Sequence, residues 1–151
     1  MKYGRYLPVY EAVDLSVFEF LSKGKHGIIR KRIVFAKTNM LGIYNLAFGN
    51  VENNGGLDDE LITNNGDRDI ILATVAQAVD KYTQRYPRRW IFFKGNTPAK
   101  TRLYRMAIGI NLRELLQKFE ILAVVDGNDE FLPFQRSMIV DAFMIKRRIN
   151  F

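Results

Sequence analysis

Three basic side chains stand where a helix is predicted to begin. Lys100, Arg102 and Arg105 follow residues 95–98, a Gly-Asn-Thr-Pro turn that suits the start of a helix. A helix N-terminus already carries about half a positive charge and several unpaired N–H groups, so cations there indicate an anionic partner such as a phosphate, a nucleic-acid backbone or a carboxylate. The predicted anion-binding residues are Lys94, Asn96, Thr97, Lys100, Arg102 and Arg105.

The formal net charge of +7 is unevenly spread along the chain. Residues 20–51 and 81–113 contain lysines and arginines but no acid, whereas acidic side chains gather between them. The two basic blocks can form a positive face that attracts polyanions. Alternatively, the acidic segment folds back and neutralises one block. The first interpretation predicts nucleic-acid contacts by Lys23, Lys25, Arg30, Arg32, Arg88 and Arg89.

Composition excludes several kinds of site. The absence of cysteine rules out disulfides, thiolate catalysis and cysteine-based zinc sites, and the single histidine, His26, rules out a multi-histidine metal site within one chain. No apolar run approaches the roughly 18 residues that a membrane-spanning helix needs, and the first residues do not resemble a signal peptide. We therefore expect one cytoplasmic domain over residues 1–151, with no membrane, metal or cofactor.

The first half of the chain is predicted to form strands. Alternating apolar residues indicate strands at 17–21, 27–35 and about 42–51. Residues 22–27 contain two glycines and predict a hairpin loop longer than two residues. Since side chains alternate along a strand, Arg30 and Arg32 are expected to point to the same side.

The safest helix prediction follows these strands. Asp67 is expected to cap its N-terminus, and Pro87 to end it. Apolar residues recur at the three- and four-residue spacing of one buried face. They are Ile71, Val75, Ala78, Val79, Tyr82 and Tyr86.

A short buried strand at 89–93 is predicted to lead into the second helix. Thr97 is the expected N-cap of this helix and Pro98 its first residue. Asn111 indicates that the helix kinks or restarts near residue 110. Its expected apolar face consists of Leu103, Met106, Ala107 and Ile110.

The order of elements favours an α+β fold. Further strands are expected at 119–125, 131–134 and 142–146, with a turn at 126–129. Hairpin-like connections at both ends favour a largely antiparallel sheet with about two main helices packed on one face. Strand aromatics usually lie in a core. We therefore expect core positions for Phe18, Phe20, Phe48, Trp90 and Phe92.

Several short segments resemble a known family. They are Gly49-Asn50, Asp58-Asp59, residues 64–69 (Asn-Asn-Gly-Asp-Arg-Asp) and above all residues 95–105 (Gly-Asn-Thr-Pro-Ala-Lys-Thr-Arg-Leu-Tyr-Arg). Together they resemble the hallmark segments of short, single-domain bacterial proteins classed as a domain of unknown function. The resemblance spans nearly the whole chain. It implies one domain of this length and no particular activity.

Three classes of function remain open. The favoured one is binding of an anionic partner, with single-stranded nucleic acid slightly preferred. The second is an enzyme acting on a phosphorylated substrate, with Mg²⁺ held by Asp58, Asp59, Asp67 or Asp69. The third is a protein interaction module in which acidic and basic surfaces pair, which includes a homo-oligomer.

Overall fold

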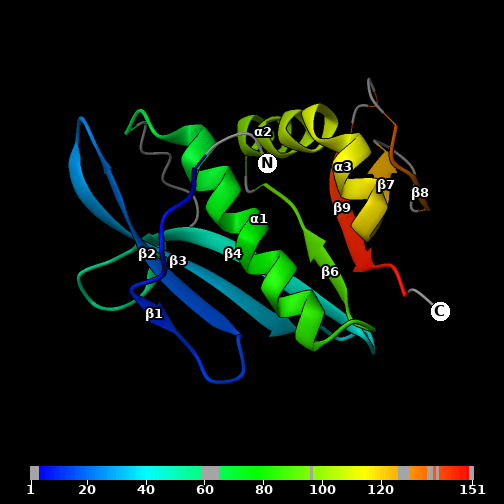
Figure 1. Ribbon diagram of the computed structural model, residues 1–151, viewed down its shortest axis with the longest axis horizontal. Coiled ribbons are helices and arrows are strands. Elements are labelled where there is room, and N and C mark those ends of the chain that lie inside the picture. The colour runs from blue at the N-terminus through cyan, green and yellow to red at the C-terminus, as the bar shows by residue number, and fades with distance from the viewer. Residues whose placement is uncertain are drawn as a thin grey trace. The chain divides into compact units, whose positions relative to one another are not determined.

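The computed structural model describes residues 4–58, 65–95, 97–125, 130–135, 138 and 140–149. It confirms the α+β prediction, with three helices and a mostly antiparallel nine-stranded sheet among these residues (Figure 1). The strand order is β1, β2, β3, β4, β6, β9, β7, β8, and β5 pairs with β4. The chain forms two compact units, one from Met1–Ala36 and Leu46–Tyr82, the other from Lys37–Asn45 and Thr83–Phe151. The expected turn at 126–129 lies outside the described residues.

The first unit is built on a long hairpin. Its elements are β1 (Tyr10–Glu11), β2 (Val17–Gly24), β3 (Gly27–Lys37), most of β4 (Ile43–Val51), β5 (Leu57–Asp58) and most of α1 (Arg68–Arg85). Pairing of β2 with β3 extends to Gly24 and Gly27, so the connecting turn has two residues and the prediction of a longer loop was wrong. Gly27 has φ +86, a conformation that glycine adopts without strain, which lets the strands run on to the turn.

Helix α1 packs with the predicted face. Ile71, Val75, Ala78, Val79 and Tyr82 are buried, and the Tyr82 ring stacks on Phe35 with centroids 4.0 Å apart. The helix ends at Arg85, two residues before Pro87, as expected. Aromatic and aliphatic burial therefore fixes α1 against the strands of its own unit.

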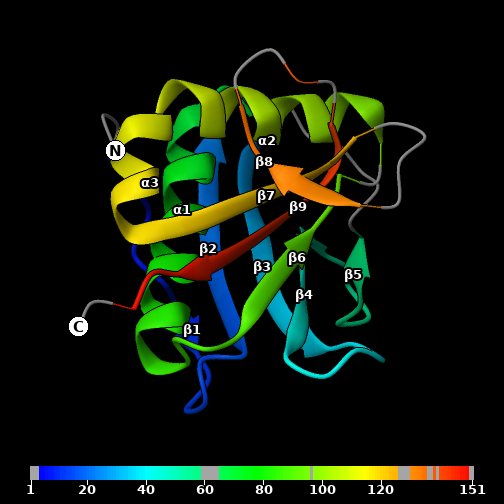
Figure 2. The same ribbon diagram turned by 90° about the vertical axis from the view of Figure 1, so that its right-hand side faces the viewer.

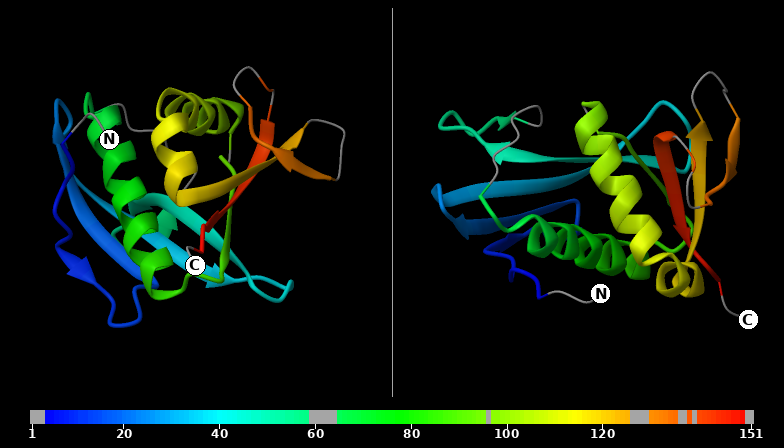
Figure 3. Two further views of the ribbon diagram at one scale, coloured as in Figure 1. Left: turned by 45° about the vertical axis from the view of Figure 1, so that its right-hand side comes forward. Right: turned by 90° about the horizontal axis from the view of Figure 1, so that it is seen from above.

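The second unit contains the remaining elements. They are β6 (Trp90–Phe93), α2 (Pro98–Ile110), α3 (Leu112–Lys118), β7 (Phe119–Val125), β8 (Phe131–Pro133) and β9 (Val140–Arg147). Strand β6 pairs in parallel with the first residues of β4 and antiparallel with β9. In Figure 2 the strands β6, β9 and β7 are on the side nearest the viewer. Figure 3 shows α3 leading directly into β7. The sequence did not reveal the parallel pair or the two-residue strands β1 and β5.

The apolar face predicted for α2 was partly wrong. Met106 and Ile110 are 45% and 74% exposed, whereas Thr101 and Ile108 are buried. Tyr104 packs edge-on against Phe93 of β6, with ring centroids 5.6 Å apart. The helix is thus rotated about its axis relative to the prediction, since contacts with β6 and with the preceding turn decide which side faces inward.

The predicted restart near residue 110 is confirmed. Helix α2 ends at Ile110 and α3 begins at Leu112. Asn111 makes the break, and its side-chain amide donates back to the carbonyl of Ala107 at 2.8 Å. No helix among the described residues is both long and apolar enough to cross a lipid bilayer.

Candidate anion-binding site

A cavity of about 300 Å³ opens at the start of α2, entirely within the second unit. Four of the six predicted anion-binding residues line it, and Thr101 and Asp141 contribute to its wall. Lys100 lies outside the lining, and Asn96 lies outside the described residues. The four predicted lining residues are Lys94, Thr97, Arg102 and Arg105.

Local backbone chemistry shapes this cavity. Thr97 is extended (φ −128, ψ 156), and its hydroxyl accepts the N–H of Lys100 at 3.1 Å, which confirms the predicted N-cap. The buried Thr101 hydroxyl lies 3.2 Å from the Gly95 carbonyl and ties the turn to the helix. A Cβ on Gly95 would lie 2.2 Å from the Thr101 nitrogen, so only glycine allows the turn to approach this closely.

Side chains, more than backbone amides, supply the positive charge. Pro98 has no N–H, the Lys100 N–H is bonded to the Thr97 hydroxyl, and the Thr101 N–H is bonded to the Thr97 carbonyl at 3.1 Å. The expectation that several free amides would bind the anion therefore needs correction. The cationic groups of the described lining are the guanidinium groups of Arg102 and Arg105 and the ammonium group of Lys94.

The charges lining the cavity are unbalanced. Lys94, Arg102 and Arg105 provide three positive charges against the single negative charge of Asp141 among the described lining residues. Lys94 and Arg102 are exposed, and neither has an ion-pair partner among the described residues. Arg105 is half-buried and donates to the carbonyl of Met138 at 3.3 Å, which holds its guanidinium at the wall.

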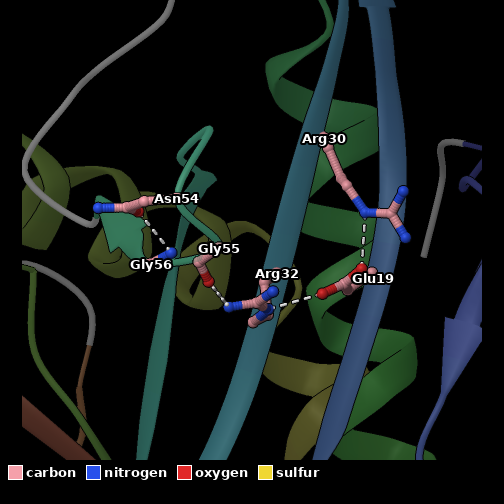
Figure 4. A network of polar contacts seen from close by, with 6 residues as sticks. All are labelled: Glu19, Arg30, Arg32, Asn54, Gly55 and Gly56. Carbon is pink, nitrogen blue, oxygen red and sulfur yellow. Dashed lines mark hydrogen bonds and ion pairs between the residues drawn. The ribbon is translucent and has the colours of Figure 1, made fainter.

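The arginines of β3 are engaged by the protein itself. The Nε atoms of Arg30 and Arg32 each donate to one oxygen of Glu19, both at 2.6 Å, and Nη1 of Arg32 donates to the Gly55 carbonyl at 2.8 Å (Figure 4). The two arginines do point to the same side, as predicted. Their acidic partner lies on the adjacent strand β2 rather than in the acidic segment, and alternation alone did not reveal this pairing.

Glu19 is a buried carboxylate held between two cations. Burial alone would raise the pKa of its carboxyl, but hydrogen bonds from Arg32 and Arg30, together with their charges, hold this pKa below its usual range. Arg30 nevertheless keeps half of its side chain exposed. The β3 arginines are therefore structural ion-pair partners first, with limited capacity for an external anion.

The other predicted nucleic-acid contacts have varied environments. Lys23 and Lys25 are exposed on the first unit, and Arg88 is exposed on the second. Arg89 is sandwiched between two rings, with its guanidinium carbon 4.1 Å from the Tyr44 centroid and 3.7 Å from that of Tyr86. Cation–π packing accounts for the position of Arg89, so it is a packing residue within its unit.

A buried polar cluster in the first unit was not found from the sequence. The Asp67 oxygen Oδ2 accepts from the hydroxyls of Tyr6 and Ser22, both at 2.6 Å, and Asn65 donates to the Ser22 hydroxyl at 3.1 Å. Burial, followed by the bond to Asp67, raises the pKa of Tyr6. Asp67 directly precedes α1, as predicted, and its carbonyl accepts the Ile71 N–H at 3.0 Å. Its carboxylate does not make the expected cap, because Oδ2 is bonded to the two hydroxyls and Oδ1 has no hydrogen-bond partner among the described residues.

Asp67 and Asp69, two of the four acidic residues proposed as magnesium ligands, have partners within the protein. Asp67 accepts the two hydroxyls just described, and Asp69 lies 3.5 Å from Arg68. The described residues contain no group of three histidine, aspartate or glutamate side chains arranged to hold a metal ion. Asp59, a further predicted ligand, lies outside the described residues.

Comparison with known proteins identifies the family and no activity. A family described as of unknown function, DUF6934, matches residues 2–148. The chain belongs to DUF6934. No curated protein and no solved structure matches the chain. Membership of DUF6934 confirms the resemblance to a short family of unknown function, and any function must be argued from the geometry of the cavity.

Proposed function

We propose that this DUF6934 protein binds a phosphate-bearing partner in the cavity at the start of α2, and that single-stranded nucleic acid is the first such partner to consider. The observation that carries the proposal is the charge imbalance of the cavity. Three cationic side chains line it against one carboxylate, and two of the three lack an ion-pair partner among the described residues.

Phosphate suits the chemistry of these groups. A guanidinium offers a planar fork of N–H donors that matches two phosphate oxygens, and an ammonium adds a compact positive charge. Arg102 and Arg105 are three residues apart on α2, so they lie on neighbouring positions of one helix face. The N-terminal end of the helix dipole adds to the attraction for a negative charge at this point.

Single-stranded nucleic acid is favoured by charge and size. The net charge of +7 supports attraction of a polyanion, while a cavity of about 300 Å³ holds a phosphate and part of its substituent but not a duplex. The magnesium-dependent alternative has less support, because Asp67 and Asp69 already have partners within the protein. An interaction module would instead show association of the protein with itself or with another protein.

The test compares two double variants that remove the same charge. Lys94→Ala/Arg102→Ala removes two cavity cations, and Arg113→Ala/Lys118→Ala removes two exposed cations of α3. Binding of pyrophosphate is measured by calorimetry, and binding of a labelled single-stranded oligonucleotide by fluorescence anisotropy. We expect the cavity variant to lose at least about tenfold in affinity for both probes, because each charge-assisted contact contributes about 1.5–3 kcal/mol. The α3 variant should lose far less.

Two results would contradict the proposal. Equal losses in the two variants would show that general positive charge, rather than the cavity, attracts the anions. Absence of pyrophosphate and oligonucleotide binding by the folded wild-type protein at low salt would remove phosphate recognition altogether. Sedimentation of the free protein in the same buffers distinguishes the interaction module, since only that alternative requires salt-dependent self-association.

A further inference from the structure

Strand β6 has aromatic side chains on the side of the sheet that faces away from the helices of the second unit. Ile91 and Phe93 are 0% and 8% exposed, and Phe93 packs against Tyr104 of α2. Alternation places Trp90 and Phe92 on the opposite side, where both are partly exposed. In Figure 2 no described helix of this unit lies between β6 and the viewer. Helices α2 and α3 therefore pack on one side of this part of the sheet only.

Neighbouring strands extend this surface. The Phe92 ring contacts Phe131 of β8 edge-on, with centroids 6.5 Å apart, and the Lys146 ammonium of β9 lies 5.4 Å from the Trp90 centroid. Phe131 is also partly exposed. We call Trp90, Phe92 and Phe131 the aromatic strip. The aromatic strip thus combines flat rings with a nearby cation, unlike a purely aliphatic sheet face.

We propose that unstacked bases of a single-stranded nucleic acid bind on the aromatic strip while an adjacent phosphate occupies the cavity at the start of α2. This inference rests on the proposed function and extends it from phosphate recognition to base recognition. Proteins that bind single strands stack bases on exposed sheet aromatics and hold the backbone with nearby cations.

Strand β6 connects the aromatic strip to the cavity at the start of α2. Lys94, which lines the cavity, follows directly on β6, so the strip and the cavity are joined by a few residues of extended chain. The four residues of β6 span roughly 13 Å, enough for about two bases. A single strand lying on the strip can therefore place its next phosphate near Lys94, where the end of β6 leads into the cavity.

The charges around the strip favour a polyanion over a second copy of this basic chain. Exposed Arg88 precedes β6, Lys94 follows it and Lys146 lies on the strip. Two described acids lie on or beside the neighbouring strands: Glu120, which is directly opposite Lys146 in the register of β7 and β9, and Glu130, which directly precedes β8. Three cations against two acids leave a net positive charge that complements phosphates, whereas two such surfaces brought together would repel each other.

Trp90 is the only tryptophan of the chain, so its fluorescence reports on the strip alone. We expect single-stranded DNA and RNA oligonucleotides to quench this fluorescence and to protect it from acrylamide. Pyrophosphate, which has no base, should bind without either effect. These measurements use the wild-type protein and do not depend on whether a variant folds.

Variants separate stacking from charge. Trp90→Leu/Phe92→Leu should weaken oligonucleotide binding by roughly 5- to 150-fold, the range of one base–aromatic stack, and leave pyrophosphate binding unchanged. Phe92→Tyr, which keeps a stacking ring, should retain wild-type affinity. Ile110→Ala, at an exposed apolar position of α2, is the matched control and should also bind normally.

The outcomes distinguish the two proposals. Normal pyrophosphate binding with oligonucleotides that neither quench nor protect Trp90 would overturn the strip and leave the cavity standing. Loss of both ligands in the Lys94→Ala/Arg102→Ala variant, with loss of oligonucleotide alone in the leucine variant, is the pattern we expect. Concentration-dependent burial of Trp90 without nucleic acid would identify a second copy as the occupant and would also overturn the inference.

Discussion

Single residues decide the form of the cavity. Gly95 lies against the first turn of α2 so closely that a methyl group at this position would overlap the Thr101 nitrogen and the Lys100 backbone. We predict that Gly95→Ala lowers the free energy of unfolding by about 1–3 kcal/mol, the usual cost of overpacking, and reduces pyrophosphate affinity. Urea denaturation and calorimetry measure the two effects. Gly4→Ala, whose Cβ would meet nothing within 4 Å, is the control. Wild-type stability and affinity in Gly95→Ala would contradict this account.

Glu19 gives a second prediction at this scale. Its folded pKa is below the unfolded value of 4.5, so the ion pairs with Arg30 and Arg32 contribute stability that is present above about pH 4.5 and is lost as pH falls through the folded pKa. Glu19→Gln should cost about 1.5–3 kcal/mol at pH 7 and flatten this acidic part of the stability curve. Denaturation between pH 2 and 7 tests the shape; identical curves would exclude a role for the carboxylate.

At the scale of elements, Tyr6 ties the N-terminal segment to the rest of the first unit through its backbone and its side chain. The Tyr6 N–H donates to the Thr74 hydroxyl of α1 at 2.9 Å, its own hydroxyl donates to Asp67, and its ring stacks on Phe20. The pKa of Tyr6 is raised above 10.0. The contribution of its protonated hydroxyl to the free energy of unfolding is therefore complete below pH 10 and is lost as pH rises through the folded pKa.

Tyr6→Phe keeps the ring but removes the hydroxyl. We expect a loss of about 1.5–3 kcal/mol near neutral pH, since the lost bond goes to a carboxylate. The spectrophotometric titration should also lose one tyrosine whose pKa is above 10.0. Tyr10→Phe, at a half-exposed position, is the matched control. A Tyr6 variant as stable as the Tyr10 variant would show that the segment is held by packing alone.

Elements with strong local signals were the ones that the sequence predicted well. The periodicity and terminating proline of α1 and the Thr97 cap of α2 depend on neighbouring residues, and both helices begin and end close to the expected positions. The inward side of α2 did not follow, because contacts of Tyr104 with Phe93 of β6 and of Thr101 with Gly95 in the preceding turn set its rotation. Likewise, residues 24–27 form a tighter turn than glycine content suggested, since pairing extends to Gly24.

At the scale of the whole molecule, charge should govern affinity. If Lys94, Arg102 and Arg105 contact phosphates, log K for a single strand should fall linearly with log salt concentration. Each contact adds about 0.7 to the slope, so Lys94→Ala/Arg102→Ala should reduce it by about 1.4. Anisotropy titrations at several salt concentrations give the slopes, with Arg113→Ala/Lys118→Ala as the control. An unchanged slope in the cavity variant would show that these residues do not meet phosphates.

Counting charges along the chain identified four residues that line the cavity, but it did not reveal the ion pairs of the β3 arginines. Lys94, Thr97, Arg102 and Arg105 are near in sequence, so the turn before α2 and the first turns of the helix bring them together. The pairing of Arg30 and Arg32 with Glu19 depends on the register between two strands, which composition does not specify. The parallel pairing of β4 with β6 joins residues 43–45 to 90–92, a separation across which no local pattern carries information.

That parallel pairing has a consequence for dissecting the protein. Each compact unit is assembled from two separate stretches of chain, with Lys37–Asn45 belonging to the same unit as Thr83–Phe151. A recombinant fragment that starts at residue 83 would lack the strand beside β6 and would leave that edge's N–H and C=O groups open to aggregation. Domain-mapping by simple truncation is therefore unsuitable here, and a permuted or co-expressed design that restores the missing nine-residue stretch is needed.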